Sequence, residues 1–516
     1  MAHRMLPRAG VVLALAAAAG LAVWNHTVTV AAGQPVPQSH AVPVSTVMRA
    51  CPAPGLTETP TAHVALIAGS ATSGTGRAVM TYTGPTTGTP LTSLTQPGVL
   101  SLAAVRSLPA PARTKTSAHT KTSAHDKASA SPTPSPAPAN QPVTTVPVPG
   151  GVVIQASGSM ARGLEAEQIA GTGKVAARCD APGTDFWFSG SGVFTAPRID
   201  LYLINPGGQP ADVSVQAFTD AGPLVGSTDS GISVAPHAMV VQSLAKMLHG
   251  ARAMALHVRT SVGQVVAAVK ESTGSAHSGV WLPASAQPAK QVVVPGMPPV
   301  AGTRQLFVTV PGTQDAHINL RAITTKGSYE PTGGSSLDIP GGSVADLSLP
   351  SLSAIPGAIE VSSNQPVTAS MLVPGGPSGA PGAFTVATDM IQEQGVVAAN
   401  TSGGGVASAL VLSAPGRAVQ ARVTQIKQGS SAQAATSTVV QIPAHHSVVA
   451  QLGRAGARHG TAFAVIVAPE AGSGPLYAGR VITASGKGGA LQSILPVPSA
   501  LTTVPLPAVR DALVSP

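Results

Sequence analysis

Apolar and polar residues alternate in short stretches along most of this chain. Period-two alternation places one face of a β-strand against a core and the other face in water. The clearest alternating stretches span residues 211–218, 318–323 and 419–424. Each follows an apolar run that ends in Pro-Gly, a pair typical of turns because proline presets φ and glycine accepts positive φ. These runs span residues 199–205, 306–310 and 409–414. The pattern therefore predicts many short strands joined by tight turns.

A repeat of about 104 residues orders these predicted strands. Two sets of residues keep this spacing, at intervals of 103 or 104: Val258, Val361 and Val465, and Pro236, Pro340 and Pro443. A fixed period predicts tandem modules of one kind. Short strands in units of about 100 residues are typical of immunoglobulin-like β-sandwiches. A β-propeller is the main alternative, but its blades of about 40–50 residues are less than half this period.

The same period extends towards the N-terminus. Ile154 lies 104 residues before Val258, and Glu167 lies 104 residues before Glu271. Strand-like runs also occur over residues 62–67, 77–82 and 151–158. We therefore expect a first module that is a diverged copy of the others. The one good helix candidate in the modules spans residues 160–170.

The predicted fold is all-β, with about four tandem immunoglobulin-like β-sandwich modules after an N-terminal membrane helix. The expected divisions are a cytoplasmic stub (1–8), a signal anchor or signal peptide (9–26), a linker (27–44), and β modules over 45–195, 196–300, 301–403 and 404–516.

The N-terminus has the features of an export signal. His3, Arg4 and Arg8 precede an uncharged run over residues 9–24. The run is shorter than the roughly 20 residues of a typical span, and fits a signal-peptide core or a short anchor. The small residues at 30–32 form a poor and late cleavage site, which favours retention as an anchor. Because positive charge stays inside, we expect a membrane protein whose bulk is extracellular, or a secreted protein if the signal is cleaved.

Residues 106–142 form a low-complexity segment inside the first predicted module. The hexamer Thr-Lys-Thr-Ser-Ala-His occurs twice, over 114–119 and 120–125, before a run rich in serine, threonine and proline. Such a segment has too little apolar area to fold, so we expect a disordered loop. An unmodified spacer is one interpretation, and an O-glycosylated segment is the other.

The two cysteines flank this loop. Cys51 precedes it and Cys179 follows it, 128 residues apart. In an exported chain, an even number of cysteines predicts a disulfide. Two free buried thiols are the alternative.

Charge excludes a nucleic-acid partner. The net charge is +9, but Arg106, Arg113, Lys115, Lys121 and Lys127 crowd one segment. The predicted modules are therefore close to neutral. Nucleic-acid binding needs a basic face with stacking aromatics, and aromatic residues make up only 3% of the chain.

The sequence offers little to support catalysis. Glu165 and Glu167 would point to different faces on a helix and to one face on a strand, and we interpret them as a polar edge. His445 and His446 would point to opposite faces of a strand and are expected in a solvated turn. A Gly-x-Ser-x-Gly elbow and a phosphate-binding loop are both absent. We expect no enzymatic activity, no cofactor and no metal site.

One aromatic cluster is a candidate for ligand or interdomain contact. It comprises Phe186, Trp187, Phe188, Phe194 and Tyr202. Exposed aromatics would stack on sugar rings or anchor a partner. The alternative is burial in a sandwich core or at the junction of the first two modules.

Several segments together resemble a known family. They are Leu-Tyr-Leu-Ile-Asn-Pro-Gly at 201–207 with Ala-Asp-Val-Ser-Val at 211–215, and the segments 162–168 and 179–188. The chain resembles an uncharacterised family of exported, membrane-anchored proteins of high-GC Gram-positive bacteria with tandem immunoglobulin-like modules. The resemblance covers most of residues 45–516 and implies fold and location, without site residues or an activity.

The sequence thus favours a non-catalytic cell-envelope protein, in which an extracellular β-sandwich array acts as scaffold, spacer or binding stalk. The alternative is a cell-wall or glycan-binding module that uses the aromatic cluster near residues 186–202. The expected partners are the membrane, through the N-terminal helix, and either cell-wall glycan or another envelope protein.

Overall fold

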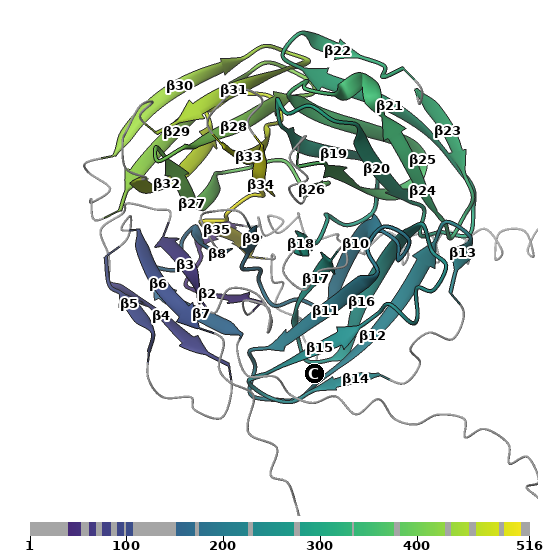
Figure 1. Cartoon of the computed structure of the whole chain (residues 1–516). Coiled ribbons are helices and arrows are strands. Elements are labelled where there is room, and N and C mark those ends of the chain that lie inside the picture. The colour runs from purple at the N-terminus through teal and green to yellow at the C-terminus, as the bar shows by residue number, and fades with distance from the viewer. Residues whose placement is uncertain are drawn as a thin grey trace, which may run out of the picture. The chain divides into compact units, whose positions relative to one another are not determined.

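The fold was obtained from a computed structural model (Figure 1). It describes residues 40–52, 61–68, 75–83, 90–96, 100–106, 151–170, 175–224, 231–272, 279–332, 335–375, 382–428, 435–453, 461–484 and 490–506. The expected stub and anchor lie outside these residues, as do most of the expected linker and loop. Among the described residues, no helix has the length and apolarity needed to cross a bilayer.

The chain divides into two compact units, Met1–Pro43 with Thr503–Pro516, and Val44–Thr502. In the smaller unit, β1 (His40–Pro43) pairs with β35 (Thr503–Leu506) in an antiparallel ladder. All other described strands belong to the larger unit.

The larger unit is all-β in its described part, apart from one short 3₁₀ turn, η1 (Pro350–Leu352). The predicted helix over residues 160–170 is wrong. Residues 164–170 form strand β8, which pairs on both sides with neighbouring strands. Leu164 and Ala166 alternate into a core, so tertiary pairing overrides the helix propensity of this segment.

The first sandwich consists of two four-stranded sheets, in the orders β2-β7-β4-β5 and β6-β3-β8-β9. Its strands are β2 (Thr46–Cys51), β3 (Thr61–Ala68), β4 (Gly76–Tyr82), β5 (Thr92–Leu94), β6 (Ser101–Arg106), β7 (Val152–Gly158), β8 (Leu164–Ala170) and β9 (Val175–Arg178). The predicted inserted loop falls between β6 and β7, which belong to this same sandwich.

The predicted disulfide is confirmed. Cys51 ends β2 and Cys179 follows β9, with their Cα atoms 4.2 Å apart. Both residues are buried in the core that the two sheets share. Because β2 and β9 belong to different sheets, the bridge ties the two layers together.

The second sandwich spans β10 to β18, with sheet orders β10-β16-β12-β13 (with β14 also on β12) and β15-β11-β17-β18. Its strands are β10 (Asp185–Ser191), β11 (Arg198–Asn205), β12 (Ala211–Thr219), β13 (Gly222–Pro223), β14 (Ile232–Val234), β15 (Ala238–Ser243), β16 (Ala253–Val262), β17 (Val266–Ser272) and β18 (Gly279–Leu282).

The third sandwich differs because β25 runs through both of its layers and joins them into one eight-stranded sheet. Its strands are β19 (Ala289–Met297), β20 (Arg304–Thr309), β21 (Ala316–Thr324), β22 (Gly327–Tyr329), β23 (Ser336–Ile339), β24 (Val344–Leu349), β25 (Gly357–Val373) and β26 (Ala383–Val386).

The fourth sandwich has sheet orders β27-β32-β29-β30 and β31-β28-β33-β34. Its strands are β27 (Gly395–Ser402), β28 (Val406–Ala414), β29 (Val419–Lys427), β30 (Thr436–Ile442), β31 (His446–Leu452), β32 (Thr461–Pro469), β33 (Tyr477–Ala484) and β34 (Leu491–Pro496).

All four sandwiches share one pairing scheme. In each, the first strand pairs with a long central strand, which also pairs with the third strand. The residues aligned by the 104-residue period, Ile154, Val258, Val361 and Val465, lie on these central strands (β7, β16, β25 and β32) and are fully buried. The period therefore marks equivalent core positions. The first strands β10, β19 and β27 all end before the module divisions expected at residues 196, 301 and 404, so each lies within the module expected to precede it.

Candidate functional site

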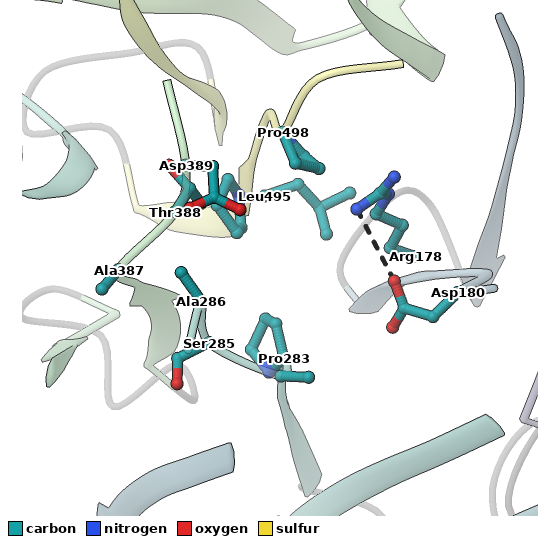
Figure 2. Close-up of a pocket in the computed structure, with 12 residues that line it drawn as sticks. Arg178, Asp180, Pro283, Ser285, Ala286, Ala387, Thr388, Asp389, Leu495 and Pro498 are labelled. Atoms are coloured by element: carbon teal, nitrogen blue, oxygen red, sulfur yellow. Dashed lines mark ion pairs between the residues drawn. The ribbon is translucent and has the colours of Figure 1, made fainter. Parts of the chain in front are cut away.

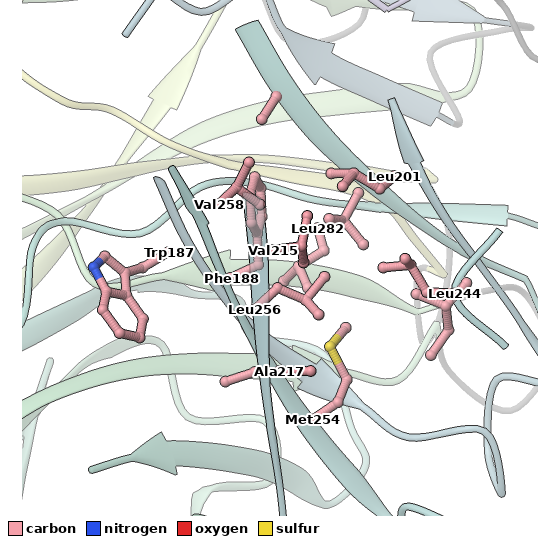
Figure 3. Close-up of a cluster of buried hydrophobic side chains, with 14 of the residues drawn as sticks. Trp187, Phe188, Leu201, Val215, Ala217, Leu244, Met254, Leu256, Val258 and Leu282 are labelled. Atoms are coloured by element: carbon pink, nitrogen blue, oxygen red, sulfur yellow. The ribbon is translucent and has the colours of Figure 1, made fainter. Parts of the chain in front are cut away.

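The predicted aromatic cluster is divided between a core, two junctions and the surface. On β10, Phe188 faces the core of the second sandwich, among Val215 and Leu256 (Figure 3). Trp187 points to the opposite face, as adjacent strand residues must. Its indole stacks on the His257 imidazole with ring centroids 3.9 Å apart, and only 5% of the residue is exposed.

Tyr202 lies at the junction of the first and second sandwiches. Its ring meets the edge of Trp281 with centroids 5.1 Å apart, and both pack against Ala50 and Val153 of the first sandwich. The Lys270 ammonium lies 5.3 Å from the Trp281 ring centroid, a cation–π distance. Tyr202 therefore serves the interdomain role that the sequence left open.

The two remaining aromatics reach the surface to different extents. Phe186 is half-buried against the second core. Phe194 is 72% exposed, the most exposed large apolar side chain among the described residues. Of the five predicted residues, Phe194 alone presents an open ring to solvent.

Hydroxyl groups join the second sandwich to the third. Ser189 Oγ and Thr309 Oγ1 lie 2.7 Å apart, and Ser285 Oγ lies 2.6 Å from Thr368 Oγ1. Phe307 and Phe384 of the third sandwich complete the apolar cluster that contains Trp187 and Phe188. The core of the second sandwich thus continues across the junction.

The third and fourth sandwiches approach backbone to backbone. A Cβ atom added at Gly479 would lie 2.4 Å from Gly296 Cα, so only glycine fits there. Ser447 Oγ donates to the Ile323 carbonyl oxygen at 2.7 Å, and Val411 and Val481 extend the apolar core of the third sandwich.

A buried carboxylate joins the fourth sandwich to the first. Strand β27 has a register shift between Val397 and Asn400 that turns two amides out of its ladder. The Glu167 carboxylate on β8 accepts hydrogen bonds from the Ala398 and Ala399 amides, at 2.9 and 3.2 Å. Arg480 Nη2 lies 3.6 Å from the same carboxylate. The contacts between sandwiches therefore form a closed cycle, from first to fourth and back to the first.

Burial dominates the ionisation of Glu167. It raises the pKa to about 7, although the charge of Arg480 and the two amides act in the opposite direction. Glu167 itself is buried, and alanines and isoleucines of both sandwiches form one apolar cluster at this junction: Ala65, Ile67, Ala398, Ala399, Ile426 and Ala464.

Glu165 shares the strand face of Glu167 but has different partners. Its carboxylate accepts from Arg178 at 2.8 Å and Arg49 at 2.9 Å. Burial would raise its pKa, but the charges and hydrogen bonds of the two arginines outweigh burial and lower it. Interpreting Glu165 and Glu167 as a polar edge was wrong, because both are buried.

The 104-residue spacing does not align Glu167 with an equivalent residue. Glu271 lies on the core-facing side of β17, together with Val269, and accepts from the Ser191 amide. Glu167 lies on the side of β8 that faces the fourth sandwich.

A small pocket lies where the ends of the last strands of the four sandwiches, and the segments that follow them, meet (Figure 2). Its volume is about 180 Å³. It is lined by Arg178, Asp180, Pro283, Ala284, Ser285, Ala286, Ala387, Thr388, Asp389, Leu495, Pro496 and Pro498. Asp180, Ser285 and Thr388 follow one another at 105 and 103 residues, so the repeat period held a signal for this pocket. The period does not show that these segments converge on one pocket, because their convergence depends on the closed cycle of contacts between the four sandwiches.

The polar groups of this pocket are mostly engaged. Arg178 Nη1 lies 3.6 Å from Asp180 Oδ1 (Figure 2), while the same guanidinium binds Glu165. Burial raises the pKa of Asp180 against the opposing charge of Arg178. Ser285 Oγ is bonded to Thr368, and Thr388 Oγ1 is buried without a hydrogen-bond partner. The volume is below the range of about 300–1,000 Å³ typical of small-molecule sites.

His445 and His446 lie at a turn and at the start of β31, and His445 adopts a left-handed conformation with φ of 59°. Within the described ranges, no group of three or more His, Cys, Asp or Glu side chains is arranged to hold a metal ion.

Comparison with known proteins gives a family and no activity. A family model described as a family of unknown function (DUF5719) matches residues 137–453, from before β7 to the end of β31. No curated protein matches the chain.

Proposed function

Because the chain belongs to the DUF5719 family, which has no known function, we propose a role from its geometry. The protein is a non-catalytic scaffold of the cell envelope. Its four β-sandwiches are immunoglobulin-like modules in tandem, exported and held at the membrane by residues 9–26.

The observation that carries this proposal is the contact between the first and fourth sandwiches. Glu167 holds two amides of β27 within a water-excluded surface. An elongated spacer or stalk gains length by keeping its first and last modules apart. A closed cycle instead fixes four modules against one another, which suits a platform that positions partners. We therefore favour the scaffold over the spacer and stalk forms.

The chemistry of the small pocket lined by Arg178, Asp180 and Ser285 supports a non-catalytic role. A nucleophile needs a base within hydrogen-bond reach, yet Ser285 Oγ is bonded to the hydroxyl of Thr368 and the carbonyl oxygen of Trp187. Arg178 of the pocket is paired with Asp180, and the second acid, Asp389, is exposed to solvent.

The disulfide and the N-terminal charge pattern support export. Disulfides form and persist in oxidising compartments, and Cys51–Cys179 joins two layers of one sandwich. Fractionation of intact cells tests the location. The full chain should stay with membranes after alkaline carbonate washing, and external protease should digest it. A variant lacking residues 9–26 should lose both properties, whereas recovery of the full chain in the soluble intracellular fraction would contradict the proposal.

A second candidate function is cell-wall or glycan binding near residues 186–202. One observation favours it: Phe194 presents an exposed ring, and the next residue, Thr195, lines a groove.

A further inference from the structure

A groove of about 470 Å³ lies between the second and third sandwiches. It is lined by Ser191, Thr195, Arg252, Thr303, Gln305, Phe307, Asp346, Leu372, Pro374, Gly375 and Gly382. Its volume exceeds that of the small pocket lined by Arg178 and Asp180, and falls within the range of about 300–1,000 Å³ typical of small-molecule sites. The motifs that the sequence singled out did not include most of these residues.

The groove offers both donors and acceptors with a balanced charge. Gln305 Nε2 donates to Asp346 Oδ1, and Ser348 Oγ donates to Gln305 Oε1 at 3.3 Å. These bonds fix the carboxylate and the amide on adjacent strands, β24 and β20. Arg252 is an exposed residue of the lining, and no ion pair joins its guanidinium to another described residue. Arg252 and Asp346 are the charged residues of the lining. A second carboxylate, Asp220, lies outside the lining, where it accepts from the Arg252 amide at 2.9 Å. Burial raises the pKa of Asp346, and the charge of Asp220 contributes to this rise. The lining itself carries no net charge, which suits a neutral polar ligand better than an anion or a cation.

Apolar surface accompanies these polar groups. Phe307, Leu372 and Pro374 contribute to the walls. Phe194, which is exposed, directly precedes Thr195 of the lining, and the Phe194 amide donates to the carbonyl oxygen of Ala251, next to Arg252, at 3.3 Å. An exposed aromatic ring beside convergent hydrogen-bonding groups matches a sugar, which has an apolar C–H face and a rim of hydroxyls.

We propose that this groove binds a neutral carbohydrate. Asp346 and Gln305 hydrogen-bond the sugar hydroxyls, Arg252 donates to ring or hydroxyl oxygens, and Phe194 packs against the C–H face of a sugar ring. The inference rests on the second candidate function, for which it names the site and the ligand class. It is independent of the scaffold proposal, whose test measures location.

An array of neutral oligosaccharides and cell-wall polysaccharide fragments, probed with the purified full chain, tests the inference. Titration calorimetry then measures the dissociation constant for the strongest hit. We expect one binding site per chain, and at least a tenfold loss of affinity in both Phe194→Ala and Asp346→Asn. Phe194 is exposed and asparagine preserves the shape of aspartate, so both variants should fold.

Two matched controls lie on the other layer of the third sandwich. Tyr329→Ala removes a partly exposed aromatic ring from β22, and Asp338→Asn neutralises an exposed carboxylate on β23. Both should leave the affinity unchanged. Two results would overturn the inference: no hit on the array, or binding that both groove variants leave intact. A chain that fails to bind sugar yet remains in the membrane fraction refutes the groove assignment alone.

Discussion

Truncation of Glu167 to alanine should open the contact between the first and fourth sandwiches. The carboxylate is 4% exposed and accepts from the amides of Ala398 and Ala399, with Arg480 as its counter-ion. The substitution leaves two amides and a fully buried guanidinium without their partner.

The cost follows from these lost contacts. Removing one partner of a buried ion pair typically destabilises a protein by about 3–5 kcal/mol, because the other charge stays buried and uncompensated. Since the pKa of Glu167 is about 7, this cost applies above pH 7, where its carboxyl group is mostly ionised. Glu167→Gln keeps one oxygen that can accept an amide hydrogen bond and loses the charge. Its cost should be smaller, about 1–3 kcal/mol.

Urea unfolding followed by far-ultraviolet circular dichroism measures both effects as changes in the free energy of unfolding. Glu330→Ala is the matched control, since this glutamate is exposed on the third sandwich and a surface substitution should change stability by less than about 0.5 kcal/mol. If Glu167→Ala is no more destabilising than this control, the reasoning about the buried carboxylate is refuted.

Three further predictions concern stability. Burial raises the pKa of Glu271 from 4.5 to about 8, so its contribution to stability is fully present below pH 4.5 and is lost as pH rises through 8. The urea concentration at the unfolding midpoint should therefore decrease as pH is raised from 5 to 9, and should decrease less in Glu271→Gln. A midpoint that increases over this range would contradict the prediction. Reduction of Cys51–Cys179, or the pair of serine substitutions, should cost up to about 5 kcal/mol from the entropy of the closed loop, and an unchanged melting temperature would argue against the bridge. Gly479→Val should lower the free energy of unfolding by about 1–3 kcal/mol, because the added side chain overpacks the junction of the third and fourth sandwiches. Gly312→Ala should not, because open space surrounds a Cβ atom at that position. Equal melting temperatures of the two variants would exclude a close approach of the two backbones at Gly479.

The strands were predictable from the sequence because alternation and turn residues act locally. The alternating stretches at 211–218 and 419–424 are β12 and β29, and Val258 and Val465 occupy buried positions on central strands. The segment 160–170 was mispredicted because helix propensity is local, whereas the pairing of β8 with β3 and β9 is not.

The contacts between sandwiches could not be predicted from sequence patterns. Burial of Trp187 and Tyr202 depends on which sheet faces pack together, and a hydrophobic strand face looks alike whether it meets its own core or a neighbour. The partners of Glu167 lie more than 230 residues away. The two cysteines were the exception, because their even number and the export expected from the N-terminus predicted their pairing.

Hydrogen exchange at the Ala398 and Ala399 amides of the unmodified protein tests the closed cycle most directly. The register shift leaves these amides outside the ladder of the fourth sandwich, so their protection depends on the Glu167 carboxylate. The closed scaffold predicts exchange as slow as at Val465, whose strand β32 is paired on both sides. Exchange at the rate of an unstructured peptide would show that the first and fourth sandwiches are apart in solution and would contradict the account.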